Sequence, residues 1–126
     1  MLLNDELEKR GFPPAPCWAE CPPGWKPLVC DLLDKLRGKC TIAQIKEKFG
    51  ELRVYVDPIP GIDEDGLFLF EQEVNEAINE ATIASNKICE VCGAPGKRYS
   101  DGWSAVYCEP HWQERLEERR RYGKRS

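Results

Sequence analysis

The chain has 126 residues, of which 41% are hydrophobic and 32% charged, with a formal net charge of −4. This length and balance indicate one folded domain, with at most a small appendage, and exclude a disordered chain. With neither a long apolar run nor a signal peptide at its start, the sequence predicts a cytoplasmic protein with reduced cysteines and no membrane partner.

Two helices are predicted in the first forty residues. A short one starts at Asn4 or Asp5 and ends near Arg10, before a proline-rich stretch that must be extended. In the second, apolar residues recur at helical spacing from about Trp25 to Arg37.

The segment from Thr41 to Val56 allows two interpretations. Thr41 and Gln44 resemble a capping box, which would start a helix over residues 41–49. The alternation in Leu52–Val56 is that of a strand, and Thr41 begins a stretch that fits a preceding one. We favour two antiparallel strands linked near residues 46–50.

An acidic loop, Asp57–Gly66, leads into the longest predicted helix, Leu67–Ser85. The acidic residues of the loop lack the spacing of a calcium loop, so they favour a helix start, where negative charge is stabilising. We expect this helix and the Trp25–Arg37 helix to sandwich the strands.

A metal-binding pattern follows the longest helix. Cys89-x-x-Cys92 and Cys108-x-x-His111 are separated by fifteen residues. Two such pairs are typical of a structural zinc site. Three thiolates and one imidazole complete a tetrahedron and leave no position for a reactive water, so we expect one structural Zn²⁺ per chain.

The residues around these ligands predict a local fold. Gly93 can close the tight turn after the first pair. Two short strands, Arg98-Tyr99 and Trp103–Tyr107, are separated by an Asp-Gly turn, and a helix begins near Pro110. The order of turn, hairpin and helix resembles a treble-clef zinc finger.

Together these elements predict an α+β fold with two main helices on a small antiparallel β-hairpin. Residues 1–85 would form this body, and residues 86–126 a treble-clef-like zinc unit with a C-terminal basic helix, packed with the body as one domain. The body carries 9 Lys+Arg against 16 Asp+Glu, and the zinc unit 9 against 6.

The other four cysteines allow two interpretations. Their spacing matches no common zinc pattern, so a second metal site is the weaker hypothesis and buried free thiols the stronger. These cysteines are Cys17, Cys21, Cys30 and Cys40.

Three motifs occur in order over residues 24–112: a Gly24-Trp25 pair, the run Lys46-Glu47-Lys48-Phe49-Gly50-x-Leu52-Arg53-x-Tyr55 and the Cys/His pairs. Together they resemble a group of small, uncharacterised proteins of bacteria and their phages. The resemblance implies a bacterial or phage setting but no particular activity.

No free histidine, nucleophile elbow or phosphate loop is present, so we expect no enzyme and no small-molecule substrate. We expect a zinc-stabilised protein that binds another protein, as an adaptor or as a phage or mobile-element inhibitor of a host nucleic-acid-targeting defence system. The alternative is a small zinc-finger protein that binds nucleic acid through its basic C-terminal helix. Candidate partner-binding residues are Lys46, Lys48, Arg53, Tyr55, Trp103, Arg119, Arg120 and Arg121.

Overall fold

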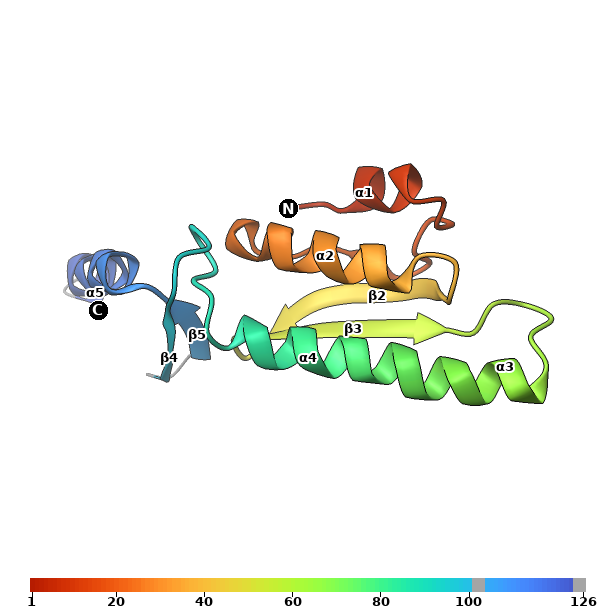
Figure 1. Cartoon of the computed structure of the whole chain (residues 1–126). Coiled ribbons are helices and arrows are strands. Elements are labelled where there is room, and N and C mark those ends of the chain that lie inside the picture. Colours follow the sequence, from red (N-terminus) through yellow and green to blue (C-terminus); the bar gives the residue numbers. More distant parts are fainter. Residues whose placement is uncertain (101–103, 124–126) are drawn as a thin grey trace.

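The computed structural model describes residues 1–100 and 104–123 and shows a mixed α+β protein (Figure 1). The predicted Asp-Gly turn and Trp103 lie outside these residues. The elements, in chain order, are α1 (Asn4–Lys9), β1 (Trp18–Ala19), the 3₁₀ turn η1 (Pro23–Trp25), α2 (Lys26–Leu36), β2 (Thr41–Lys48), β3 (Glu51–Asp57), α3 (Glu64–Leu69), the π-helical turn η2 (Phe70–Val74), α4 (Asn75–Ser85), β4 (Lys97–Ser100), β5 (Ser104–Tyr107) and α5 (Glu109–Gly123).

The central sheet has the order β1-β2-β3, with β1 parallel and β3 antiparallel to β2. The strand interpretation of residues 41–49 is therefore confirmed. The hairpin turns through Phe49 and Gly50, whose φ angles are 55° and 77°. Two consecutive positive φ angles are typical of the tight turn that matches the twist of a two-stranded ribbon.

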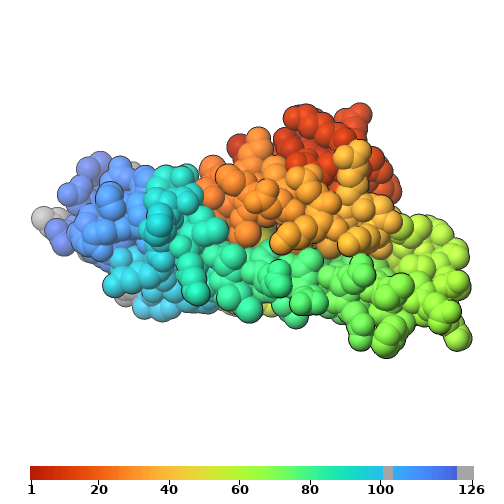
Figure 2. All heavy atoms as spheres, viewed as in Figure 1, coloured from red at the N-terminus to blue at the C-terminus, as the bar shows by residue number. Residues whose placement is uncertain are grey.

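Both long helices cover the same face of this sheet, so the predicted sandwich is wrong. α2 contacts α4 directly, and Figure 2 shows the two helices together over the strands. The physical reason lies in the strands, which are apolar on one side only. Ile45, Leu52 and Val54 are buried beneath the helices, whereas their neighbours Lys46 and Tyr55 point to the other side.

The longest helix starts earlier than predicted and runs without a break through α3, η2 and α4. The Asp63 carboxylate accepts a hydrogen bond from the Gly66 backbone N–H at 2.7 Å and so caps the helix start. Asp63, Glu64 and Asp65 therefore belong to a helix N-terminus, as predicted, whereas Asp57 ends β3.

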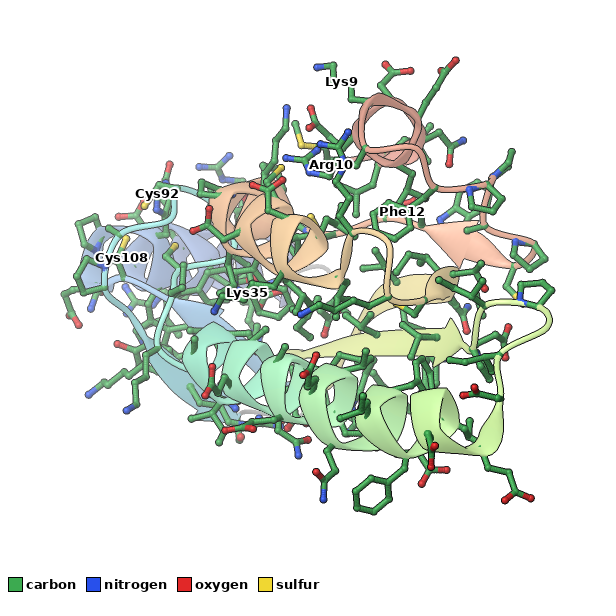
Figure 3. The ribbon with its side chains drawn as sticks, turned by 45° about the vertical axis from the view of Figure 1, so that its right-hand side comes forward. Lys9, Arg10, Phe12, Lys35, Cys92 and Cys108 are labelled. Carbon is green, nitrogen blue, oxygen red and sulfur yellow. The ribbon has the colours of Figure 1, made fainter. Side chains whose placement is uncertain are left out.

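The short helix α1 and its flanking residues also contribute to the hydrophobic core. Leu3, Leu7 and Phe12 are buried in the same hydrophobic core as the apolar residues of α2 and the sheet. The Arg10 guanidinium joins α1 to α2, because it contacts Glu6 at 2.8 Å and Asp34 at 2.6 Å. Figure 3 shows Arg10 pointing from α1 towards α2.

Candidate metal centre

The first pair of predicted ligands lies on a tight turn between α4 and β4. The Gly93 N–H donates to the Cys89 carbonyl at 3.0 Å, and the φ angle of Gly93 is 81°. A residue with a β-carbon would be strained in this conformation, which explains the glycine after Cys92. We call residues 89–93 the knuckle.

The second pair is placed by the end of β5 and the start of α5. Cys108 directly follows the strand, and its carbonyl accepts the N–H of Trp112 at 2.9 Å in the first turn of the helix. His111 lies in that same turn, and Pro110 precedes it where a missing N–H is harmless. The β4–β5 hairpin brings this turn back to the knuckle.

The four side chains meet with the spacing of a tetrahedral site. Their ligand atoms all lie within 4.8 Å of one another. Zinc bonds of about 2.3 Å to sulfur and about 2.0 Å to nitrogen set tetrahedral edges of roughly 3.8 Å between sulfurs and roughly 3.5 Å between sulfur and nitrogen. Cys92 Sγ lies 3.7 Å from Cys108 Sγ, and His111 Nδ1 lies 3.6 Å from Cys89 Sγ. Figure 3 shows Cys92 and Cys108 close together at this end of the molecule.

The environment of the thiols favours the charged form at one position and opposes it at another. Burial alone would raise the pKa of Cys89, but the backbone N–H groups of Cys108, Cys92 and Val91 lower it to about 6. For Cys108, the His111 backbone N–H lowers the pKa, but burial and the two neighbouring thiols raise it overall. A divalent cation would remove the repulsion between neighbouring thiolates.

The histidine is also oriented as a ligand. Its Nδ1 faces the sulfurs, 3.1 Å from Cys108 Sγ, while Nε2 lies 3.7 Å from the Glu114 carboxylate. A metal bound at Nδ1 leaves the proton on Nε2, where a carboxylate can hold the ring in place. The donor set therefore fits one zinc, held by Cys89, Cys92, Cys108 and His111, which would cross-link the knuckle to α5.

A contact that the sequence did not reveal joins the knuckle to the body. The Gly24 N–H donates to the Glu90 carbonyl at 2.8 Å, and the Trp25 indole N–H donates to the Ile88 carbonyl at 2.9 Å. A β-carbon on Gly24 would lie 2.0 Å from the carbonyl oxygen of Cys89. Gly24 and Trp25 thus hold the knuckle against the body through two hydrogen bonds and a close backbone contact.

A second contact connects the β2–β3 turn with the β4–β5 hairpin. A β-carbon on Gly50 would lie 3.1 Å from the Cα of Ala105. The Arg98 guanidinium donates to the carbonyl of Phe49 and, at 2.9 Å, to the side-chain oxygen of Asn86. The Phe-Gly pair of the central motif therefore has a structural role in joining the body to the zinc unit.

Glu90 is a half-buried carboxyl group where the zinc unit meets the body. One of its carboxyl oxygens accepts the Val106 N–H at 2.6 Å, and its own N–H donates to the Val106 carbonyl at 2.9 Å. Burial raises the pKa of Glu90 to about 7. Nothing in the spacing of the motif distinguishes this residue from an exposed glutamate, so only the structure reveals it.

Trp112 has a structural role. Its ring stacks on Tyr99 with the ring centres 4.1 Å apart, and on Tyr107 at 6.3 Å. These contacts hold α5 against the β4–β5 hairpin and occupy the ring.

The predicted partner-binding residues lie in two separate places. Lys46, Lys48, Arg53 and Tyr55 share the face of the sheet that the helices leave uncovered. The arginines of the C-terminal helix are exposed in the last turns of α5, and Trp103 lies outside the described residues. These arginines are Arg119, Arg120 and Arg121.

The remaining cysteines do not form a second cluster. Within residues 1–100 and 104–123, the knuckle and α5 supply the only group of three or more metal-ligating side chains that gathers in one place. Burial raises the pKa of both Cys21 and Cys40 to about 11. These two thiols are part of the hydrophobic core, as predicted for free cysteines. For the other two the prediction of buried thiols is wrong, because Cys17 is exposed and Cys30 is only half-buried.

No protein-family model, curated protein or solved structure matches the chain. Among the described residues, every helix is too short or too polar to cross a membrane.

Proposed function

We propose that the protein is a non-enzymatic binding protein, stabilised by one zinc, that acts on another protein. The closed set of three cysteines and one histidine supports a structural role for the metal, because no ligand position remains for water or substrate. The order of knuckle, hairpin and helix, which resembles a treble clef, fits the same role. The metal would hold the C-terminal unit in a fixed position on the body.

The observation that carries the protein-binding role is the charge of the long helix and its flanks. Residues 54–86 contain no lysine or arginine. Their eight acidic residues are Asp57, Asp63, Glu64, Asp65, Glu71, Glu73, Glu76 and Glu80. α2 neutralises only part of this charge, since Lys35 pairs with Glu80 at 3.9 Å and Lys39, after α2, pairs with Glu73 at 3.3 Å.

The rest of the helix presents carboxylates beside exposed apolar side chains. We call Glu64, Asp65, Glu71 and Glu76 the acidic helix face; all four are exposed. Phe68 and Leu69 stand among them with 60% and 54% of their surface accessible. Charged groups that steer a partner towards the surface, and apolar groups that become buried in the complex, are the two components of a protein-binding surface.

A basic partner surface is complementary to this helix, and grooves that bind nucleic acid are basic. Carboxylates along one helix can occupy such a groove in place of phosphates. This argument, together with the small size and the resemblance to bacterial and phage proteins, supports the proposal of a phage or mobile-element inhibitor of a nucleic-acid-targeting host protein.

Native mass spectrometry of the gently purified protein from bacterial cells tests the proposal. We expect one zinc per chain and a protein partner in fixed ratio, which a short DNA duplex displaces. The quadruple variant E64Q/D65N/E71Q/E76Q should lose the partner. A control, D5N/E8Q/D31N/E117Q, removes the same charge from exposed sites elsewhere and should retain it. A partner that stays bound to the first variant would refute the role of the helix.

A further inference from the structure

The uncovered face of the sheet carries exposed aromatic rings that the fold does not use. Trp18 on β1 aligns with Gln44 on β2, which aligns with Tyr55 on β3, so all three stand in one row across the sheet. Trp18 and Tyr55 have 54% and 44% of their surface exposed. Two strand spacings separate them by about 10 Å.

Both rings are held in place although they are exposed. The Trp18 indole N–H donates to the Glu20 carboxylate at 2.7 Å. The Lys46 ammonium lies 5.6 Å from the centre of the Tyr55 ring. Rings that are already oriented lose little freedom when a flat partner stacks on them.

Basic side chains lie on the same face of the sheet, between these rings and the β2–β3 turn. Lys46 aligns with Arg53, and Lys48 lies two residues further along β2. At the turn itself, Phe49 is 63% exposed, and the Lys48 ammonium lies 5.6 Å from its ring. Aromatic rings and cations thus alternate along a track of roughly 15 Å, as expected for about five residues of strand.

Two of the carboxylates near this track are already engaged. Glu20 holds the Trp18 indole and lies 3.9 Å from the N-terminal ammonium. Glu51 pairs with Arg53 at 3.6 Å and with Arg98 at 4.0 Å. By contrast, neither Lys46 nor Lys48 has an ion pair among the described residues, so both ammonium groups are available to a ligand.

We propose that this face binds single-stranded nucleic acid, with bases stacked on Trp18 and Tyr55 and phosphates near Lys46, Lys48 and Arg53. Exposed rings interleaved with cations are the elements of a single-strand platform, because every base has a face that can stack and every nucleotide carries a negative charge. A duplex hides its base faces within the stack and cannot use the rings. This site is separate from the acidic helix face and from the basic C-terminal helix.

Fluorescence anisotropy of the zinc-loaded protein with labelled oligothymidine and oligouridine of about 12 nucleotides tests the proposal. We expect binding that weakens as salt rises from about 50 to 200 mM and that exceeds binding of a duplex of equal length. The variant W18A/Y55A should weaken it at least five-fold, about the lower limit for one stacking contact. I83A, which removes a similarly exposed apolar side chain from α4, should leave it unchanged.

A second pair of variants separates stacking from charge. K46Q/K48Q should reduce the salt dependence, whereas K87Q, which removes an exposed lysine outside the face, should not. Zinc content and circular dichroism verify that each variant is folded. The proposal is overturned if the wild type does not bind the single strands, if a duplex binds equally well, if oligoglutamate displaces the oligonucleotide at equal charge, or if folded W18A/Y55A binds normally.

Discussion

Replacing Gly24 with alanine is predicted to separate the knuckle from the body. The new β-carbon would lie 2.0 Å from the Cys89 carbonyl oxygen, whereas ordinary contact begins at 3.4 Å. The two segments must therefore move apart by about 1.4 Å, the difference between these values. Gly24 does not have a positive φ angle, so alanine brings no backbone strain of its own and the contact alone causes the effect.

The magnitude follows from the hydrogen bonds that this movement breaks. The bonds from Gly24 to Glu90 and from Trp25 to Ile88 are 2.8 and 2.9 Å long and cannot survive such a displacement. Leaving a buried polar group unpaired costs about 1–3 kcal/mol, so two cost roughly 2–6 kcal/mol. Because a domain of this kind is stable by only about 5–15 kcal/mol, the loss is a large fraction of the total.

Two measurements test this prediction on the zinc-loaded protein. Urea unfolding followed by tryptophan fluorescence gives the loss of stability, and transfer of zinc to a chelating dye gives the release rate. G24A should lower the free energy of unfolding and accelerate the release of zinc. The control G61A has a φ of 83° but no atom near the new β-carbon, so it should cost about 1–2 kcal/mol of backbone strain and leave zinc release unchanged. An equal loss of stability and an equal rate of zinc release in the two variants would refute the role of Gly24 in holding the knuckle.

Three further predictions concern the metal, the N-terminal ion pairs and the free thiols. C92S, or removal of metal by a chelator, should abolish stoichiometric zinc binding and expose the zinc unit to limited proteolysis; unchanged zinc content by atomic emission would refute the ligand set. Arg10 and then Lys9 lower the pKa of Glu6 from 4.5 to about 2, so its stabilisation is present above pH 4.5 and lost as pH falls towards 2. The difference in unfolding free energy between wild type and R10M should therefore shrink as the pH falls through this window, and a constant difference would contradict the ion pair. A thiol reagent at pH 8 should modify the exposed Cys17 quickly and the buried Cys40 only upon unfolding, as peptide mapping would show.

The sequence predicted best the features that depend on near neighbours. The two Cys/His pairs, the turn at Gly93 and the helix that begins near Pro110 are each encoded within a few residues. The structure has this turn and this helix and brings the four Cys and His side chains together. The acidic start of the long helix is also local, although Asp63 places it before the first apolar repeat.

Features that depend on distant segments were missed or wrong. Periodicity shows that a helix has an apolar side, but not which element that side meets, so it could not place α2 and α4 on one face. β1 has only two residues, too few for alternation to reveal a strand, and Trp18 was therefore not associated with Tyr55. The contact between Gly24 and Cys89 joins residues far apart in the sequence, which spacing cannot detect.

The residues explained by the fold help to locate the function. Gly24 and Trp25 hold the knuckle, and Gly50 and Arg98 join the two hairpins, so the structure accounts for these residues of the sequence motifs. The same explanation does not extend to the uncovered face of the sheet. Its exposed rings bury little apolar area and gain little for stability where they stand. A partner that covers them would provide the missing reason, and the oligonucleotide experiment asks directly whether that partner is a single strand.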